Sequence, residues 1–477
     1  MHARFRRFLS GILFTSLVCL SAGCAAQEEG GLFGGGGSGG GNLGFGTVAF
    51  QLPEEGEVIT APFTVSASAD GIAFALFYLD GTQVAVAPAP PHVLEIDPLT
   101  LSKGEHRVGV TVVHVTGDER RASATIMVVR PRPPLADIMA AIDGLAPGEW
   151  YEIPETPMRD VDWARDQPPH VRGDIQSIIG GGSGGAYDTK RDRLVVWGGG
   201  GTSTRNDMYA FDLNQAAWVR LTDPSPFADG ADTNTFGVVT HPDGAPVSRH
   251  SFDSVDYIPS PVDRLYLGGG HFASTAETKS YLFDFETNTW EIGPDITTPT
   301  VGGHCAVDGN NIVWQHGIGW PPGSVLSSVD VVAHTSSDHA TYLGFYNQGA
   351  TSDIDPTRNL LVAVGDGKTR VWDLDNPGAA SVVWNTTGDI EIESDFGPGV
   401  VYHPVSDRMV CWSGGKDVFV LDLDTRAWSR LVGQGDVDPG AAGAVLGRWR
   451  YVPSKDVFIV VTNADRNVCV YRLAPLP

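Results

Sequence analysis

Helix-forming patterns are scarce in this sequence of 477 residues. Apolar residues seldom recur at the spacing of an amphipathic helix, and 59 glycines and 32 prolines break the chain into short runs. That pattern argues against a helical bundle and favours an all-β protein. A chain of this length is expected to hold two or three domains.

Basic residues are also scarce, because 32 Lys and Arg face 57 Asp and Glu and give a formal net charge of −25. A chain with so few cations lacks the basic footprint that nucleic acid or an anionic membrane surface requires. We therefore expect no nucleic-acid partner. Cationic ions or neutral sugars suit such a surface better, and a solvated acidic surface without any ligand is the simpler explanation.

Cysteine occurs only five times. Two of the five lie in the first 24 residues, and the other three are Cys305, Cys411 and Cys469. Their wide spacing provides neither a disulfide framework nor a C-x-x-C metal or redox motif. Buried free thiols are the expected state.

The N-terminus carries an export signal in residues 1–23. The basic stretch MHARFRR precedes an apolar run over residues 8–20, which is too short for a permanent membrane span. The run ends in LSAGC, which resembles the bacterial lipobox, with Ser21 where that motif usually has leucine. The resemblance implies cleavage before Cys24 and lipidation of Cys24, and Ala25 in place of aspartate favours the outer membrane or cell surface. An ordinary cleavage site is the alternative, and the lipid anchor would be the only membrane contact.

Residues 24–46 form a Gly-rich tether, and residues 47–130 form the first domain. TVAFQLP, FTVSASA, FALFYLDG, HRVGVTVVHV and ASATIMVV are strand-sized runs that turn residues separate, which predicts a small β-sandwich. FYLDG followed by KGEHRVGVTVVHVTGD resembles the bacterial immunoglobulin-like domains, in which a DG hairpin and a G-x-H strand start recur. Here they are Asp80-Gly81 and Gly104 to His106. The resemblance implies a stalk or spacer, and no chemical constellation is evident.

Residues 131–147 are expected to be a linker with a short helix. Four apolar residues follow the i, i+3, i+4, i+7 spacing, and Gly144 is placed to end the helix; the four are Leu135, Ile138, Met139 and Ile142. This apolar stripe is predicted to dock on a neighbouring domain.

Residues 148–477 repeat a unit of four strands in about 45 residues, which is the pattern of a β-propeller blade. GAYD, RLVVWGGG, DMYAFDL and AWVRL match SFDSVDY, RLYLGGG, SYLFDF and TWEI, and also VVYH, RMVCWSGG, VFVLDL and AWSRL. The interval from an acidic residue to a tryptophan is the same in these three copies: Asp212 to Trp218, Asp284 to Trp290 and Asp422 to Trp428. The glycine cluster, the aromatic residue and the tryptophan resemble the kelch motif. That resemblance implies a kelch-type β-propeller, a fold used by binding scaffolds and enzymes alike.

The last repeat lacks its fourth strand, because the chain stops after DVFIVVTN and NVCVYRL. An incomplete sheet would leave an open edge. The segment Trp150 to Ile153, WYEI, reads like the fourth strands AWVRL and AWSRL, and we predict that it completes the last unit. The fold expected for the whole chain is therefore all-β, with an immunoglobulin-like sandwich followed by a six-bladed kelch-type propeller. Seven blades are possible if the insertion over residues 222–248 hides strands.

The candidate ligand-binding residues are basic and map to one face of two adjacent repeats, where first strands begin and second strands end. They are Arg249, His250, His271, His304 and His316. Imidazoles that converge at a channel mouth could bind Zn or Cu or act as acid and base groups. The same histidines could instead bond backbone carbonyls of the next repeat. We expect a carbohydrate or protein ligand at this face, with a metal-dependent oxidase or a glycan-active enzyme as the competing class.

Three other motifs have a structural explanation beside the chemical one. Tyr402-His403 resembles the adjacent copper ligands of galactose oxidase, but Tyr402 aligns with Tyr187 and Tyr257 as a turn-anchoring aromatic residue. The acidic turns at residues 373–376 and 436–438 could take Ca²⁺ but lack a full calcium loop and suit hairpin turns. The glycine runs are expected at turns that need positive φ, since no helix follows them.

Overall fold

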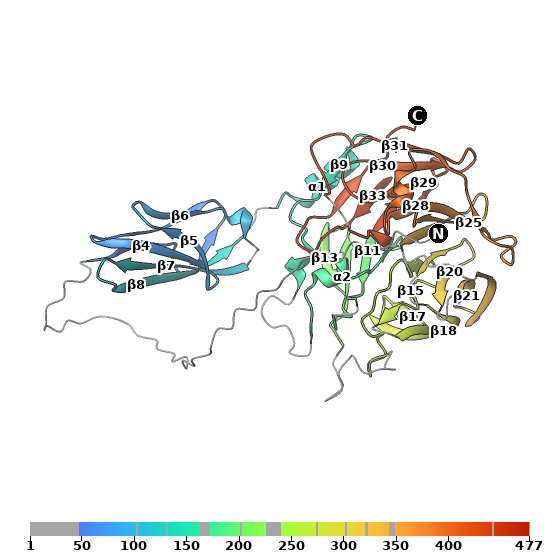
Figure 1. Cartoon of the computed structure of the whole chain (residues 1–477), viewed down its shortest axis with the longest axis horizontal. Coiled ribbons are helices and arrows are strands. Elements are labelled where there is room, and N and C mark those ends of the chain that lie inside the picture. The colour runs from blue at the N-terminus through green and yellow to red at the C-terminus, as the bar shows by residue number, and fades with distance from the viewer. Residues whose placement is uncertain are drawn as a thin grey trace, which may run out of the picture.

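The computed structural model describes residues 47–476 except for short gaps at 102–103, 130–131, 163–170, 201–202, 226–239, 273–274, 301–302, 320–322, 343–348 and 441–442. The described chain is all-β, with many small sheets and few helices (Figure 1). None of the helices in these ranges has the length and apolar character needed to cross a bilayer. The export signal, Cys24 and the tether lie outside the described residues.

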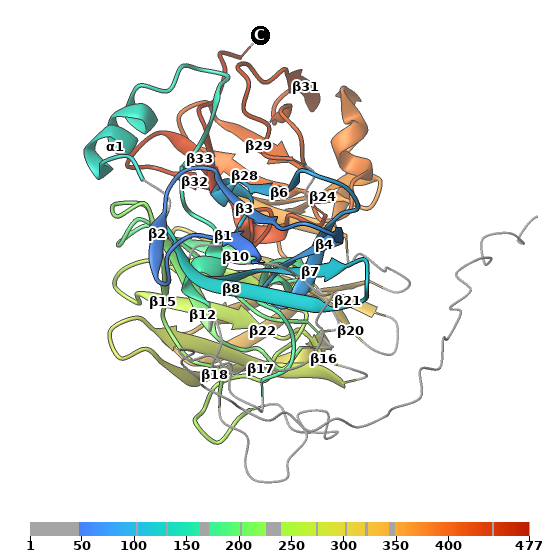
Figure 2. The same ribbon diagram turned by 90° about the vertical axis from the view of Figure 1, so that its left-hand side faces the viewer.

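Two sheets make the N-terminal domain. One has the order β1 (Ala49–Gln51), β3 (Phe63–Ser68), β6 (His92–Ile96), and a short 3-10 turn, η1 (Pro98–Thr100), follows it. The other has the order β2 (Glu57–Ile59), β8 (Glu119–Val128), β7 (Gly104–His114), β4 (Ile72–Leu79), β5 (Thr82–Ala87). Phe77, Val108, Val110 and Ile126 are buried in the single core of this domain. Figure 2 shows the long strands β7 and β8 side by side. The arrangement is consistent with an immunoglobulin- or fibronectin-like sandwich.

Asp80 links the two motifs that suggested this domain. Asp80 and Gly81 have φ values of 49° and 79°, as a tight β4–β5 hairpin turn requires. The Asp80 carboxylate accepts a hydrogen bond from Nδ1 of His106 at 2.6 Å and another from the backbone N–H of Arg107 at 2.8 Å. One side chain thus joins the hairpin to the beginning of β7, which gives a physical reason for the two motifs to occur together.

Six further sheets follow in chain order, numbered sheet 1 to sheet 6 here. Sheet 1 holds β10 (Gly185–Asp188), β11 (Arg193–Trp197), β12 (Met208–Asp212) and β13 (Ala217–Arg220). Sheet 2 holds β14 (Val255–Ile258), β15 (Arg264–Gly268), β16 (His271–Phe272), β17 (Thr275–Asp284) and β18 (Thr289–Thr300). Sheet 3 holds β19 (Gly303–Val307), β20 (Ile312–Gly319), β21 (Gly323–Asp330) and β22 (Thr335–Tyr342).

The other three sheets repeat the same antiparallel order. Sheet 4 holds β23 (Ala350–Asp355), β24 (Leu360–Gly365), β25 (Lys368–Asp373) and β26 (Val382–Val383). Sheet 5 holds β28 (Gly399–His403), β29 (Arg408–Trp412), β30 (Val418–Asp422) and β31 (Ala427–Leu431), with β27 (Thr387–Gly388) beside β31. Sheet 6 holds β32 (Trp449–Val452), β33 (Val457–Val460), β34 (Cys469–Tyr471) and, from far earlier in the chain, β9 (Trp150–Glu152).

The first strands of the six sheets contact one another in a closed cycle. β10 contacts β14, β14 contacts β19, β19 contacts β23, β23 contacts β28, β28 contacts β32, and β32 contacts β10 again. A separate hydrophobic cluster lies between each pair of neighbouring sheets, including sheets 6 and 1. Each sheet therefore buries both faces, which explains why its central strands read as continuous apolar runs instead of alternating ones.

Strand β9 completes sheet 6, as predicted from the WYEI motif. It pairs antiparallel with β34, with Trp150 opposite Tyr471, Tyr151 opposite Val470 and Glu152 opposite Cys469. Within the insertion, the described residues 222–225 and 240–248 hold no strand, only an isolated bridge between Thr240 and Pro246. Residues 226–239 lie outside the described chain.

The predicted linker helix is present as α1 (Leu135–Asp143). Ile138 and Ile142 are fully buried in the cluster between sheets 1 and 6. The side chain of Arg472 donates a hydrogen bond to the carbonyl of Ile142 at 3.1 Å. Ile138, Ile142 and the partly buried Met139 of the predicted stripe thus dock between sheets 1 and 6, whereas Leu135 is exposed. The remaining short helices are η2 (Met158–Val161), α2 (Gln176–Gly180), η3 (Ile390–Ser394) and η4 (Leu446–Arg448).

Candidate functional site

His304 and His316, two of the predicted site residues, are directly paired across β19 and β20. Their ring centroids are 5.1 Å apart, and both rings lie against Trp372 of β25 in the next sheet, at 5.7 and 4.7 Å. Both histidines are almost completely buried. The structure therefore brings these two imidazoles together inside the boundary between sheets 3 and 4.

Three ring nitrogens of His304, His316 and Trp372 have no hydrogen-bond partner among the described residues. Nδ1 of His304 shares a hydrogen bond of 2.6 Å with the hydroxyl of Ser352. Nε2 of His304, Nδ1 of His316 and Nε1 of Trp372 are buried and unpaired there. Unpaired buried nitrogens are uncommon, because each loses its hydrogen bonds to water.

Burial keeps both imidazoles neutral. It lowers the pKa of His304 to about 3, and Arg370 adds a smaller effect in the same direction. Burial, then His304 and Arg370, hold the pKa of His316 well below its usual value. A neutral imidazole can bind a metal but cannot serve as a general acid near neutral pH. Within the described ranges, no three His, Cys, Asp or Glu side chains are grouped as metal ligands.

Arg249 and His250 lie just before β14 and hold neighbouring loops together. Arg249 is 2% exposed, and its guanidinium donates to the carbonyls of Val247 and Gly269 at 2.9 and 3.3 Å. Nδ1 of His250 is hydrogen-bonded to the carbonyl of Gly181. A Cβ atom on Gly200, where φ is 70°, would lie 3.0 Å from the His250 ring. His250 thus bonds a backbone carbonyl, as in the structural alternative, but one from the preceding repeat and not the next. Gly200 lies in the loop after β11 and has positive φ, as expected for the glycine runs.

The chain after His250 runs beside the beginning of sheet 3. Asp253 forms a parallel bridge with His304, and its backbone N–H donates to the carbonyl of Gly303 at 3.2 Å. His271 is in β16, where its backbone pairs with Ala276, and its side chain lies outside the described atoms. Convergence of all five predicted residues on one point therefore remains a prediction.

The sequence reasoning missed a buried charge network among the first strands. The Arg450 guanidinium donates to the carbonyl of Gly185 at 2.8 Å and lies 3.8 Å from carboxylate oxygens of both Asp253 and Asp256. The Asp253 carboxylate accepts a hydrogen bond from the backbone N–H of Ser352 at 2.9 Å. This network joins sheets 1, 2, 4 and 6. The sequence feature that could have indicated this network is the presence of charged residues within first strands that are otherwise apolar.

Asp353 of β23 also acts electrostatically on Arg450, and burial together with these charges shifts the pKa values of Asp253, Asp353 and Arg450. Burial raises the pKa of Asp253 well above its usual value, and raises that of Asp353 to about 6. Burial alone would lower the pKa of Arg450, but the carboxylates of Asp256, Asp253 and Asp353 raise it overall. The Arg450 guanidinium therefore stays charged, whereas burial disfavours ionisation of the neighbouring carboxyl groups. Arg450 is thus the cation that stabilises these buried aspartates.

The side chains of Tyr402 and His403 are hydrogen-bonded to residues of turns. The Tyr402 hydroxyl donates to Asp407 at 2.8 Å, and Nε2 of His403 is 3.2 Å from a carboxylate oxygen of Asp456. The same tyrosine–aspartate turn recurs as Tyr187 with Asp192, Tyr257 with Asp263 and Tyr451 with Asp456. The turn-anchoring interpretation is confirmed, and these residues do not fit the copper-binding pair of galactose oxidase.

The remaining motifs also have structural roles. Asp373 and Asp438 accept hydrogen bonds from backbone N–H groups two residues further along, as hairpin turns do. Cys305, Cys411 and Cys469 are buried free thiols, and burial raises the pKa of Cys469 to about 12. The expected state of these cysteines is confirmed.

Comparisons with known proteins give only partial likenesses. No family model and no curated protein sequence matches the chain. Among solved structures, the chain is similar to fibronectin(III)-like modules of Clostridium thermocellum CbhA, at 20% identity over 18% of this chain and 100% of that chain, with a TM-score of 0.16. It is also similar to an endo-beta-1,4-mannanase from Thermotoga petrophila, at 16% identity over 18% of this chain and 20% of that chain, with a TM-score of 0.15. Likenesses of this size assign no function.

Proposed function

We propose that residues 148–477 form a six-bladed β-propeller of the kelch type, with sheets 1 to 6 as its blades. The closed cycle of contacts among the six first strands supports this proposal. A propeller buries each blade between two others, and the six hydrophobic clusters between neighbouring sheets agree with that arrangement. The pairing of β9 with β34 would be the closure of the ring, since it joins the two ends of the repeat region in one sheet.

In this proposal the protein is exported, anchored by a lipid on Cys24 and displayed at the outer membrane or cell surface. The propeller serves as a binding scaffold for a carbohydrate or protein ligand at the face that carries Arg249 and His250. The observation that favours a binding function over a catalytic one is that the described basic side chains of the predicted site are hydrogen-bonded to the backbone or buried and neutral. Arg249 and His250 hold backbone carbonyls, and His304 and His316 are buried and neutral.

Replacement of Cys24 by serine should move the protein from the detergent phase to the aqueous phase, and an unchanged distribution would contradict the anchor.

A metal-dependent enzyme is the second candidate, favoured by the unpaired Nε2 of His304 and Nδ1 of His316. Neutral imidazole nitrogens are the form that Zn or Cu binds. These two residues and Ser352, which orients His304, are the groups that would hold such an ion.

Three measurements on one pair of proteins separate the two candidates. The full-length protein and its His250→Ala/His304→Ala variant are compared by elemental analysis and on a glycan array, followed by capture of protein partners. The binding proposal predicts no stoichiometric metal in either protein and a ligand signal that weakens in the variant. One equivalent of Zn or Cu that the variant loses would instead establish the metal site and reject the pure binding scaffold.

A further inference from the structure

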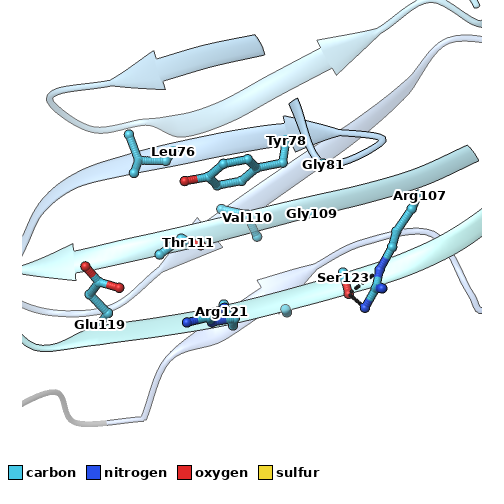
Figure 3. A pocket seen from close by; sticks show the side chains of 11 residues that line it. Leu76, Tyr78, Gly81, Arg107, Gly109, Val110, Thr111, Glu119, Arg121 and Ser123 are labelled. Atoms are coloured by element: carbon cyan, nitrogen blue, oxygen red, sulfur yellow. Dashed lines mark hydrogen bonds between the residues drawn. The ribbon is translucent and has the colours of Figure 1, made fainter. Parts of the chain in front are cut away.

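A groove of about 960 Å³ crosses the outer face of the five-stranded sheet in the N-terminal sandwich (Figure 3). It lies over β4, β7 and β8, on the side opposite to the core residues Phe77 and Val108. This domain was expected to be a spacer, so a groove on its surface needs its own explanation.

Strand register places the side chains of the groove in two rows. Tyr78, Gly109 and Ser123 are direct neighbours across the three strands, and so are Leu76, Thr111 and Arg121. Because side chains alternate along a strand, both rows face outward. Gly109 lies between Tyr78 and Ser123 and has no side chain. The outer face of the sheet therefore has a depression at Gly109.

The backbone conformation at position 109 does not require a glycine. Its φ is not positive, and a Cβ atom built on it would meet its nearest neighbours, in Ala122 and Ser123, at 3.4 Å, which is an ordinary contact. A Cβ atom at this position is therefore compatible with the fold. The glycine leaves room above the sheet, which is a property that a ligand would use.

The polar groups around this depression are largely uncommitted. The Tyr78 hydroxyl, the Thr111 hydroxyl and the Arg121 guanidinium have no hydrogen-bond or ion-pair partner in the described chain, and neither has the Glu119 carboxylate. Arg107 donates to the hydroxyl of Ser123 through Nε at 3.3 Å and Nη2 at 3.0 Å, which leaves Nη1 available. Figure 3 shows Tyr78 above the depression and Arg107, Arg121 and Glu119 along its opposite side.

The chemistry of this set matches a sugar chain that carries carboxylates. A tyrosine ring offers an apolar face for the C–H groups of a pyranose and a hydroxyl at its edge. Guanidinium groups bind carboxylates through two parallel hydrogen bonds, and hydroxyl groups match sugar hydroxyls. Two guanidiniums and one carboxylate line the groove on a chain of net charge −25, and the carboxylates of Asp80 and Glu55 lie beside Arg107, so Arg121 is the lining cation that a ligand carboxylate can reach without competition from them. Arg121 is complementary to the carboxylates of a polyanion, and the apolar side chains beside it, which are Leu76, Tyr78 and the half-exposed Val86 opposite Leu76, form a small surface for a protein partner.

We propose that this groove binds an acidic polysaccharide of the uronic-acid class. Tyr78 stacks on a sugar ring above Gly109, and Arg121 pairs with a uronate carboxylate. Arg107 and Thr111 contact the sugar hydroxyls. The site is separate from the face of sheets 1 to 6 under the proposed function and does not depend on it.

The first test uses full-length protein in detergent and isothermal titration calorimetry with polygalacturonate oligomers. Binding is expected at low salt and should weaken as NaCl is raised, because exposed charge pairs are screened. Neutral mannan oligomers of equal length should bind at least tenfold more weakly. Polyglutamate should also bind at least tenfold more weakly, because it offers carboxylates without sugar rings. Absence of polygalacturonate binding, or equal binding of either control polymer, would overturn the proposal.

Five variants locate the site: three in the groove and two controls outside it. Tyr78→Ala and Arg121→Ala should each weaken binding by about tenfold or more. Gly109→Val should abolish it with an unchanged melting temperature, since valine suits a strand but fills the depression. Arg120→Ala, the neighbouring arginine outside the groove, should bind like the parent protein. His250→Ala should also leave this binding unchanged, even if it impairs a ligand of the other face. Unaltered affinity in the three groove variants, with intact folding by circular dichroism, would reject the assignment.

Discussion

Replacement of Trp150 by alanine is expected to lower the free energy of unfolding of the repeat region by about 3–5 kcal/mol. The Trp150 side chain is 4% exposed, and its indole N–H donates to the carbonyl of Lys416 at 2.8 Å. Its ring centroid lies 5.5 Å from that of Trp412 and 4.9 Å from that of Tyr471. Trp150→Ala thus removes a large buried side chain at the boundary between sheets 5 and 6, and also loosens the strand that completes sheet 6.

Urea denaturation followed by tryptophan fluorescence and far-UV circular dichroism measures this loss. Glu152→Ala is the matched control, because Glu152 is in the same strand and exposed, and its hydrogen bond from Asn467 is at the surface. That variant should lose less than about 1 kcal/mol. If Trp150→Ala lost no more than Glu152→Ala, β9 would not be part of the cooperative core.

Replacement of Arg450 by alanine is expected to have the second large effect, about 3–5 kcal/mol near neutral pH. Arg450 is the cation beside the buried carboxylates of Asp253 and Asp256, and its side chain also bonds the carbonyls of Gly185 and Gly447. Without it, the carboxylates are left in a low-dielectric interior with no counter-charge. Uncompensated buried charge is among the costliest defects that one substitution produces.

The loss in Arg450→Ala should grow with pH. A buried carboxyl whose folded-state pKa is raised contributes stability that is present at low pH and is lost as pH rises through that pKa. Burial already raises the pKa of Asp353 to about 6 with Arg450 in place, and removal of the cation raises it further. The destabilisation is therefore expected to be smaller at pH 5 than at pH 8.

Arg448→Met is the control for this pH dependence. Arg448 is also buried, but it bonds backbone carbonyls, such as that of Val461 at 3.1 Å, and burial lowers its pKa to about 10. Its loss should cost stability with little change between pH 5 and pH 8. Equal pH dependence in the two variants would contradict the role given to Arg450.

Motifs whose meaning lies in local spacing could be interpreted from the sequence. The WYEI segment at Trp150 was recognisable because the last repeat lacked a fourth strand and an unfinished sheet edge is unfavourable. The helix with Ile138 and Ile142 followed from its period, and the tyrosine turn at Tyr402 from its match with other repeats. In each case one repeat unit or one turn of helix contained the whole pattern.

Features that depend on distant partners could not be derived in this way. Arg450 contacts Asp253, nearly 200 residues away, and a charged residue in an apolar strand gives no indication of its partner. His304 and His316 were assigned to one face, but their contact with Trp372 depends on how sheets 3 and 4 meet. The groove at Gly109 requires the register of three strands, whereas the sequence shows only a glycine within one of them.

The central claim is that residues near position 150 close the ring by pairing with β34, and an engineered crosslink tests it most directly. Glu152 is directly opposite Cys469, and the hydrogen bond from Ile153 N–H to the carbonyl of Val468 makes theirs the non-hydrogen-bonded pair. Such pairs have Cα atoms about 4.5 Å apart, within the range that a disulfide spans. Under mild oxidation, Glu152→Cys should form a disulfide with Cys469, seen as a crosslinked peptide by mass spectrometry. Glu149→Cys, which faces Arg472, should keep a free thiol. A Glu152→Cys thiol that stays as reactive as the one in Glu149→Cys would contradict the closure.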